Sequence, residues 1–526
     1  MRPSVRTLSA AIISLALILI PTSERLGLPK ESEIIPPLPV IEQVTDWTPE
    51  ELNKPPNIII VLSESFWDMT KLPGLEFSRD PIPMYHELAR RYTSGTMLSP
   101  MFGGGTANVE LEVLTGYSYR FFPEGSIVYE QYIKQPTESL ASQLGRQGYA
   151  TTAISPFHQW FFNSAEVYRH MGFSRFIPLE YFNPDEYVGP YIGDHAVAKR
   201  IIEESERSPG ADLIFANTME NHYHYWPGKF KNNTITIKSR GNPSAEAIGI
   251  AETYAQGSQG ADRMLQELIL HFSLLKEPTI LVFFGDHLPS LEKYTVYTET
   301  GYITGEDDPD FLRKMHEVPV LIWNNYLQDA PREQLELSPS FLGPYVLRMA
   351  GLQGGAYSDY LSGLYERMPI LPPEGDYERF GIDRTLAESW RARQEERFLN
   401  EQNHAAEALA AQPPFTLGYG KPEIRHISPE FLTAGGDGNG PVLLTLEGGR
   451  FSQGATVYAG GKKLTTNWSS ESSVSVNLPK EYYAKPGTIR LEIKVLDSKE
   501  NVLAISEPAQ VTVMPRASSA LSPEGK

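Results

Sequence analysis

The run Asn57-Ile-Ile-Ile-Val-Leu-Ser-Glu-Ser65 is the strongest local indication of the fold. Its five consecutive apolar residues, 58–62, suit a short strand that is buried on both faces. Similar short apolar runs recur along the chain, separated by helical patterns, at residues 150–154, 213–216, 280–284 and 318–323. Strands that alternate with helices in this way predict an α/β domain whose central, mainly parallel sheet is flanked by helices.

Polar side chains follow four of these predicted strands. They are, in chain order, Glu64, His158, His222 and the adjacent pair Asp286 and His287. Each one taken alone has an ordinary structural explanation, such as a helix cap, a turn or an exposed loop residue. Ligand sites of open α/β sheets, however, lie at the carboxyl ends of the strands. We therefore expect these side chains to meet at one edge of the sheet.

The segment Phe102-Gly-Gly-Gly-Thr-Ala-Asn-Val-Glu-Leu-Glu-Val-Leu-Thr-Gly116 leads three glycines into a predicted helix that begins at Thr106 and ends at Gly116. A flexible loop in which Thr106 caps the helix is the structural alternative. Glycine lets a substrate approach the backbone closely, and a helix N-terminus favours a phosphate group. The segment therefore predicts a phosphate site that contains the Thr106 hydroxyl.

One divalent metal ion fits the combination of two carboxylates, one imidazole and one hydroxyl oxygen that is supplied by Glu64, Asp286, His287 and Thr106. A metal ion bound to the Thr106 hydroxyl would lower its pKa and make it a nucleophile. His222 and His158 would bind the phosphate or protonate the leaving alkoxide. Glu220 and His224, next to His222, stay open as alternative ligands or proton carriers.

Four motifs, taken in chain order, resemble the lipoteichoic acid synthase family. They are the strand followed by Glu64, the Gly-Gly-Gly-Thr106 helix start, Asn221-His222 and Gly285-Asp286-His287, and the resemblance covers about residues 55–370. That family belongs to the sulfatase and alkaline-phosphatase superfamily. The resemblance implies that Glu64, Thr106, Asp286 and His287 bind manganese, with Zn²⁺ or Mg²⁺ as alternatives. It also implies that Thr106 takes up glycerol phosphate from phosphatidylglycerol and that His222 binds substrate.

His158 and the stretch Phe161-Phe-Asn-Ser-Ala-Glu-Val-Tyr168 resemble a substrate-binding segment of the same family, in a shortened form. By this resemblance Phe162 and Asn163 join His158 as substrate-binding residues. Phe162 stands for the family's tryptophan, and Ser164 stands for its arginine. Because a guanidinium group is a preferred partner of phosphate, this replacement leaves the head group of the donor open.

Composition excludes several other classes of function. The chain has 526 residues, a formal net charge of −19 and no cysteine. A net-acidic chain is a poor partner for nucleic acid. The absence of cysteine excludes disulfides, zinc–thiolate sites and sulfatase chemistry that starts from a modified cysteine.

The domain organisation follows from changes in composition along the chain. Residues 1–30 contain an apolar run, 8–20, behind Arg2 and Arg6, which indicates a signal peptide, a membrane anchor or the end of a longer membrane region, with a buried core helix as the fourth alternative. The first three alternatives place the rest of the chain outside the cytoplasm. Residues 31–56 form a proline-rich linker without helix or central strand, and 57–375 form the catalytic domain.

The remaining residues are predicted to form a solvated helical connector at 376–420, a small all-β domain at 421–515 and a disordered tail at 516–526. Strands of the β domain are expected at residues 442–446, 456–458, 473–476, 489–495 and 509–513. The segments around Pro422, Gly448 and Gly460 resemble immunoglobulin-like IPT/TIG domains, which implies a β-sandwich. A passive spacer or lid is the favoured role, with wall or glycan binding as the alternative.

Together with the apolar run near the N-terminus, the resemblance to the lipoteichoic acid synthase family implies an extracytoplasmic phosphoglycerol transferase at a membrane surface. Its donor would be a phosphatidylglycerol-like lipid, and its acceptor a glycerophosphate or glycan hydroxyl. A phosphodiesterase or a phosphoethanolamine transferase on the same fold is the alternative enzyme. A wall-associated binding module without activity is the alternative from another class.

Overall fold

The computed structural model describes residues 41, 43–327, 331–436 and 440–516. The apolar run at 8–20 and the predicted tail from residue 517 onward lie outside these ranges, so the predictions made for them stay predictions. Within the described ranges, no helix is both long and apolar enough to cross a lipid bilayer.

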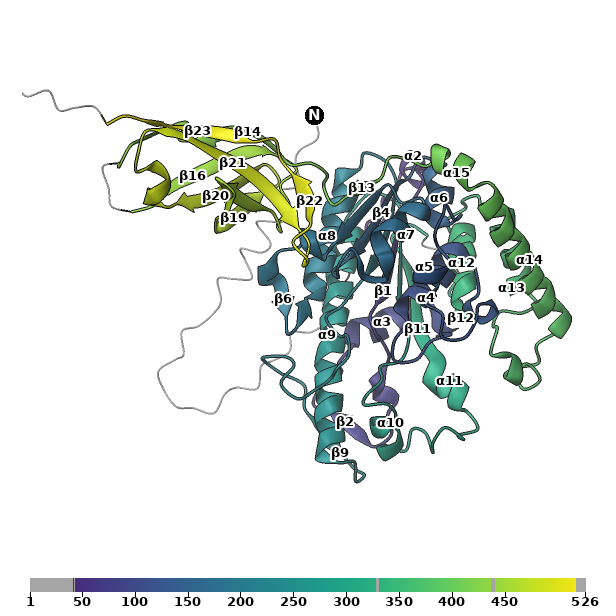
Figure 1. Ribbon diagram of the computed structural model, residues 1–526. Helices are drawn as coiled ribbons and strands as arrows, with labels where there is room; N and C mark the ends of the chain where they lie inside the picture. The colour runs from purple at the N-terminus through teal and green to yellow at the C-terminus, as the bar shows by residue number, and fades with distance from the viewer. Residues whose placement is uncertain (1–40, 42, 328–330, 437–439, 517–526) are drawn as a thin grey trace, which may run out of the picture. The chain divides into compact units, whose positions relative to one another are not determined.

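A nine-stranded sheet forms the centre of the larger domain (Figure 1). Its strands, in spatial order, are β12 (Gln334–Leu337), β3 (Thr93–Leu98), β11 (Glu317–Asn324), β10 (Thr279–Gly285), β1 (Asn57–Ser63), β8 (Asp212–Asn217), β4 (Ala150–Ser155), β5 (Arg175–Pro178) and β13 (Thr416–Leu417). β11 runs antiparallel to both of its neighbours, and the other pairs are parallel. The predicted α/β class with a mainly parallel sheet is confirmed.

The five predicted strands are all present, but four strands of this sheet were not predicted. β3 is the most central of them, and it lies between β11 and β12. Its sequence, Thr93-Ser-Gly-Thr-Met-Leu98, has no continuous apolar run, so it lacks the signal by which a buried strand is predicted. β5, β12 and β13 are only two to four residues long.

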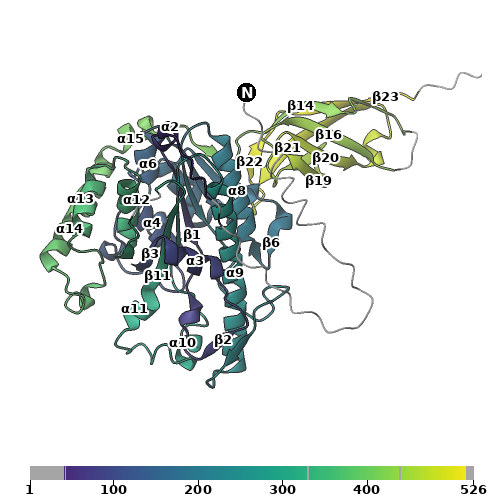
Figure 2. The ribbon, with the colours of Figure 1, turned by 180° about the vertical axis from the view of Figure 1, so that it is seen from behind.

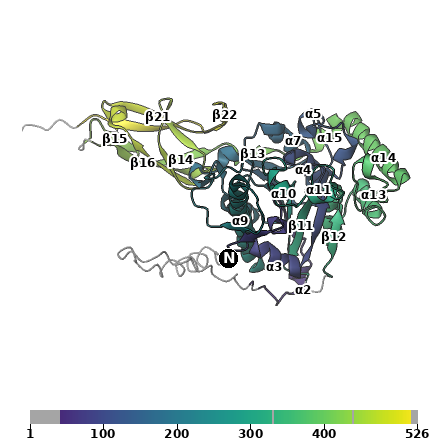
Figure 3. The same ribbon diagram turned by 90° about the horizontal axis from the view of Figure 1, so that it is seen from below.

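Helices cover both faces of the sheet, as the alternating side chains of β1 show. Ile58, Ile60 and Leu62 pack against one group of helices: α4 (Thr106–Thr115), α6 (Leu140–Gly145), α12 (Leu342–Met349), α13 (Ala356–Tyr365) and α14 (Arg384–Asn403). Ile59 and Val61 pack on the other face against α3 (Pro83–Arg91), α8 (Asp194–Arg207) and the C-terminal half of α9 (Ala245–Ser273). Figures 1, 2 and 3 show these two layers from three directions.

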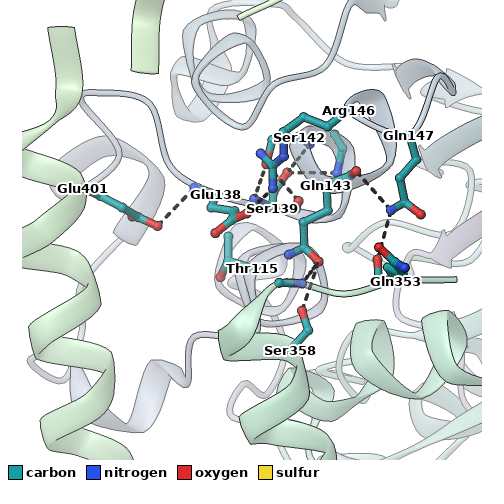
Figure 4. A network of polar contacts seen from close by, with 12 residues as sticks. Thr115, Glu138, Ser139, Ser142, Gln143, Arg146, Gln147, Gln353, Ser358 and Glu401 are labelled. Atoms are coloured by element: carbon teal, nitrogen blue, oxygen red, sulfur yellow. Dashed lines mark hydrogen bonds and ion pairs between the residues drawn. The ribbon is translucent and has the colours of Figure 1, made fainter. Parts of the chain in front are cut away.

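The predicted connector is helical, with α14 followed by α15 (Ala405–Ala411), but it is not simply solvated. Trp390 is fully buried, and its indole N–H donates to the Tyr357 hydroxyl. The guanidinium group of Arg397 donates to the Glu401 carboxylate and to backbone carbonyls of the catalytic domain. Glu401 in turn accepts the Glu138 N–H, as Figure 4 shows. The prediction that this helix carries only solvated charges is therefore wrong, because one face packs on the domain.

Part of the predicted proline-rich linker also packs on the domain. One helical turn, α2 (Pro49–Leu52), interrupts it, so the prediction of a segment without helix is wrong. Proline fits the first position of a helix, where its missing N–H costs no hydrogen bond. Thr48 and Glu51 close this turn with reciprocal hydrogen bonds, and the Val44 N–H donates to the Ser273 carbonyl.

The C-terminal region is an all-β domain, as predicted. One sheet contains β14 (Glu423–Ser428), β16 (Val442–Gly449), β20 (Ser473–Leu478) and β19 (Thr466–Ser470). The other contains β15 (Phe431–Thr433), β23 (Ala509–Met514), β21 (Gly487–Leu496), β17 (Thr456–Ala459) and β18 (Lys462–Lys463), with β22 (Val502–Ile505) paired to β21. Alternate residues of β16, β20 and β21 are buried, which is the pattern of a two-sheet sandwich.

Candidate metal centre and active site

Two neighbouring strands bring the predicted carboxylates together. β1 and β10 are parallel and in register up to Ser63 and Gly285. Glu64 and Asp286 are the next residues on each strand, so the two side chains emerge side by side at the carboxyl edge of the sheet. This position is where open α/β sheets place their ligand sites.

Glu64, Asp286 and His287 form a buried cluster whose ligand atoms all lie within 4.8 Å of one another. His287 Nε2 lies 3.2 Å from Asp286 Oδ2 and 3.8 Å from Glu64 Oε1. The other ring nitrogen, Nδ1, donates to the Leu288 carbonyl at 3.0 Å, so Nε2 presents its lone pair to the cluster. It is the one cluster of three or more such residues in the described ranges.

The electrostatics of this cluster are those of a cation site. Burial, together with the Glu64 charge, raises the pKa of Asp286 to about 6, although His287 opposes the shift. Burial lowers the pKa of His287, but the charges of Asp286 and Glu64 outweigh burial and raise it. Asp286 Oδ2 and His287 Nε2 are buried without a hydrogen-bond partner. An unpartnered carboxylate oxygen and an unpartnered imidazole nitrogen, with the Glu64 carboxylate beside them, fit a divalent metal ion.

Two residues that the sequence did not single out hold the carboxylates in place. The Ser65 N–H donates to Asp286 Oδ1 at 2.8 Å, and its hydroxyl donates to Glu64 Oε1 at 2.6 Å. Ser65 does this from a left-handed backbone conformation, with φ of 53°. Thr218, at the end of β8, accepts the Glu64 N–H with its hydroxyl. The two Ser65 hydrogen bonds fix both carboxylates, and the Thr218 hydrogen bond fixes the backbone of Glu64.

The glycine loop delivers Thr106 to the same cluster. Gly103, Gly104 and Gly105 all have positive φ, and a Cβ atom on Gly105 would lie 2.0 Å from the end of the Met101 side chain. α4 then begins at Thr106 and ends at Gly116, as predicted. Thr106 Oγ1 donates to Glu64 Oε2 at 3.4 Å, and the residue is partly exposed. The hydroxyl therefore lies between the cluster and solvent, at a helix N-terminus.

Glu110, one helical turn after Thr106, anchors α4 in the core beneath the site. Its fully buried carboxylate accepts hydrogen bonds from the Tyr129 hydroxyl, the Tyr168 hydroxyl and the Asn217 amide. Burial raises the pKa of Glu110 to about 7, although the three donors oppose the shift. The carboxylate joins α4 to β8, because Asn217 is the last residue of that strand.

We expect Glu110 to make the stability of the domain depend on pH. The native state holds this proton up to about pH 7, whereas an ordinary glutamate loses it near 4.5. Stability is therefore greatest at low pH within this window and falls as pH rises through it. Glu110→Gln should remove this loss. The free energy of unfolding of the variant, relative to that of wild type, should therefore rise by about 1–3 kcal/mol from pH 5 to pH 8.

Urea unfolding at both pH values measures this difference. Glu124→Gln, at an exposed position, serves as the control. Equal slopes of stability against pH in wild type and in Glu110→Gln would refute the assignment.

His222 lies in the loop that follows β8, where the sequence predicts it. Its Nδ1 lies 2.9 Å from the Tyr223 carbonyl. Because a carbonyl only accepts, Nδ1 carries the proton and Nε2 has the free lone pair. The Tyr191 hydroxyl lies 3.2 Å from the same Nδ1 and donates to the same carbonyl. Burial raises the pKa of Tyr191, and the Glu64 charge acts in the same direction.

His158 lies beyond the carboxyl end of β4, with its Nδ1 3.1 Å from the buried Glu180 carboxylate. Its ring stacks on Trp160. Phe162 packs against the core and Asn163 precedes α7 (Ser164–His170); both have left-handed φ. The hydroxyl of Ser164, at the position of the family's arginine, donates to the Phe161 carbonyl and closes the turn. No cation therefore stands at this position.

The two residues left open beside His222 lie apart from the three-residue cluster. The Glu220 carboxylate is buried and accepts the Asp194 N–H at 2.8 Å. His224 is exposed, and its nearest acidic partner is Glu292 at 3.9 Å.

Comparison with known proteins agrees with this geometry. Residues 56–352 match the sulfatase family, and residues 422–512 match the IPT/TIG domain. A putative cyclic beta-1,2-glucan modification protein of Rhizobium meliloti is 37% identical over 322 residues, which is 60% of this chain and 49% of that protein. The capsular polysaccharide biosynthesis protein RkpI of the same organism is 29% identical over 45% of this chain and 42% of its own length.

The chain thus spans about half the length of the curated relatives that it matches. Among solved structures, the phosphoglycerol transferase GacH of Streptococcus pyogenes, in complex with sn-glycerol-1-phosphate, has the same fold. The TM-score is 0.55 at 20% identity, over 69% of this chain and 98% of that chain. Because the sulfatase match covers more than half of the sequence, the protein belongs to the sulfatase family and carries a C-terminal IPT/TIG domain.

Proposed function

We propose that the protein is a metal-dependent phosphoglycerol transferase with Thr106 as its nucleophile. The observation that carries this proposal is the hydrogen bond from Thr106 Oγ1 to Glu64, at the rim of the cluster with Asp286 and His287. The lack of cysteine removes the usual starting residue of sulfate-ester chemistry, whereas a threonine at a helix N-terminus suits a phosphate. Glu64, Asp286, His287 and Thr106 would hold the ion, with Mn²⁺ as first choice and Zn²⁺ or Mg²⁺ as alternatives.

The first half of the reaction transfers phosphoglycerol to the enzyme. Thr106 Oγ1 gives its proton to Glu64 Oε2, along the observed hydrogen bond, and forms a bond to phosphorus. The bond from phosphorus to the lipid oxygen breaks, and His222, after taking a proton from solvent at its free Nε2, gives that proton to the diacylglycerol that leaves. A bound divalent metal ion would supply positive charge to the phosphate and favour the ionised form of Thr106.

The second half transfers the group to the acceptor. An acceptor hydroxyl gives its proton to the free Nε2 lone pair of His222 and bonds to phosphorus. The bond from phosphorus to Thr106 breaks, and the threonine oxygen recovers its proton from Glu64. His158, held by Glu180, together with Phe162 and Asn163, would form the edge of the substrate site.

A glycan is the acceptor that we favour over glycerophosphate. Trp226, which is 47% exposed, lies on the loop that carries His222. Aromatic rings exposed beside a reaction site suit the apolar faces of sugar rings. The names of the two Rhizobium relatives, which concern a cyclic glucan and a capsular polysaccharide, support the same choice. A lipid donor would require an extracytoplasmic position at a membrane surface.

Because Ser164 replaces the family's arginine, hydrolysis or the transfer of phosphoethanolamine is the second candidate function. The serine hydroxyl is used within its own turn, so the donor head group lacks the guanidinium partner that the resemblance leads us to expect. A catalytically silent wall-binding module is disfavoured because Glu64, Asp286 and His287 are all present and grouped.

The direct test combines labelled phosphatidylglycerol, Mn²⁺ and cyclic β-glucan with the protein. We expect diacylglycerol release together with glycerophosphate on the glucan. Free glycerophosphate as the product, with or without glucan, would replace the transferase by a hydrolase. No release from phosphatidylglycerol, with turnover of phosphatidylethanolamine, would reassign the donor and identify Ser164 as the reason.

A further inference from the structure

Lys229 is a buried lysine behind the His222 loop. Its residue is 4% exposed, and its ammonium group donates to the His222 carbonyl. Three aromatic rings surround the ammonium group, with centroids at 5.0 Å (Tyr225), 5.1 Å (Phe230) and 5.7 Å (Tyr191). A lysine is rarely buried without a specific partner, because removing an ammonium ion from water is costly.

The local sequence explains how the lysine turns inward. Trp226-Pro-Gly-Lys229 is a turn in which the Lys229 N–H donates to the Trp226 carbonyl. Gly228 has φ of 89°, which the third position of such a turn requires, and proline fits the second. The turn reverses the chain after His222 and points Lys229 back toward that residue.

Carboxylates on neighbouring elements favour the charged form of Lys229. Burial lowers its pKa to about 8, while the charges of Glu64, Glu220 and Asp194 oppose the shift. Asp194 and Glu220 form a buried acidic pair at the start of α8, where Glu220 accepts the Asp194 N–H. The charges of this pair therefore favour the ammonium form of the lysine that donates to the His222 carbonyl.

We propose that Lys229 is a positioning residue for His222. Its ammonium group fixes the carbonyl of His222, while the Tyr191 hydroxyl and the Tyr223 carbonyl fix the ring. The backbone and the ring are thereby held from separate directions, with Nε2 left free for proton transfer. The Glu64 charge also favours the ammonium form of Lys229, whereas Ser164 supplies no positive charge. The inference rests on the proposed function for the role of His222, but not for its geometry.

Lys229→Met tests the proposal because methionine keeps the apolar stem and removes the donor and the charge. Lys231→Met, two residues away and exposed, is the matched control. We expect Lys229→Met to lower kcat on the order of 10- to 100-fold with little change in KM, since small displacements of a reacting group cost this much. Metal content and melting temperature should stay close to those of the control.

A substrate-independent readout separates this proposal from the proposed function. In protein labelled with ¹⁵N-histidine, the His222 signals, assigned with His222→Gln, should show a single Nδ1–H tautomer in wild type. Lys229→Met should give a mixture of tautomers. Suppose that Lys229→Met loses the single His222 tautomer but that even the wild-type protein turns over no donor. The proposed function then fails, and the positioning role of Lys229 stands.

Tyr191→Phe provides a second variant in case Lys229→Met unfolds. It removes the hydroxyl that lies beside His222 Nδ1 and leaves the lysine in place. It should cause a loss of kcat and a change in the His222 signals in the same direction. Unchanged kcat and an unchanged His222 tautomer in a folded Lys229→Met protein would overturn the proposal.

Discussion

Thr106→Ala is expected to reduce turnover on the order of 10³-fold or more, because it removes the atom that bonds to phosphorus. The fold should survive, since Thr106 is partly exposed and the hydrogen bond from its hydroxyl to Glu64 is long, at 3.4 Å. Alanine also favours the helix that begins at this position. The measurement is diacylglycerol release under single-turnover conditions, with the melting temperature as a check on folding.

Thr106→Ser is the matched control for this change. Serine keeps an oxygen nucleophile in the same place, so it should retain part of the activity that alanine loses. A rate in Thr106→Ala within tenfold of wild type would contradict the mechanism. In that case water, rather than the protein, would be the nucleophile.

Asp286→Asn is expected to have the second large effect, the loss of the divalent metal and of turnover with it. Asp286 is fully buried, and its Oδ2 atom has no hydrogen-bond partner. This atom lies 3.2 Å from His287 Nε2, in the cluster with Glu64. Asparagine is nearly the same size but lacks the charge that a divalent ion requires. Metal analysis of the purified protein, and titration with Mn²⁺, should show affinity reduced at least about 10- to 100-fold.

Asp308→Asn is the control for Asp286→Asn, since Asp308 pairs with Lys314 outside the cluster. Mn²⁺ should raise the melting temperature of wild type and of the control, because a ligand that binds only the native state stabilises it. It should have little effect on Asp286→Asn. Metal bound equally well by both variants would show that the ion sits elsewhere.

The main features of the fold are predictable from sequence because each depends on local information. The run at 58–62 is long and apolar, and its register with β10 places Glu64 and Asp286 at the same edge. The glycine loop before Thr106 has a local signature as well, because Gly104, with φ of 152°, has a backbone conformation that favours glycine. These segments predict the central sheet and the grouping of Glu64, Asp286 and His287.

Other parts of the site depend on contacts that no local pattern shows. Ser65 holds the carboxylates and Thr218 holds the backbone of Glu64, but serine and threonine after a strand are common. Glu110 looks like an ordinary glutamate of an amphipathic helix until Tyr129 and Tyr168 meet it in the core. Lys229 follows a Pro-Gly turn, a position where lysine usually faces solvent.

The same limitation explains the errors in the fold. β3 has the polar, glycine-containing sequence of a loop, and its neighbours β11 and β12 make it a strand. The charges of α14 have the composition of a solvated helix, yet Arg397 lies over the rings of Tyr117 and Tyr357. In both cases tertiary packing overrides the local preference.

The most direct test of the account is to look for phosphoglycerol on Thr106 itself. Wild-type protein with Mn²⁺ would be mixed with labelled phosphatidylglycerol without acceptor, quenched in acid and analysed by peptide mass spectrometry. The account predicts label on the peptide that contains Thr106, and loss of that label when a glucan acceptor is added before quenching. Diacylglycerol release at the wild-type rate, with no label on that peptide at any time, would contradict it.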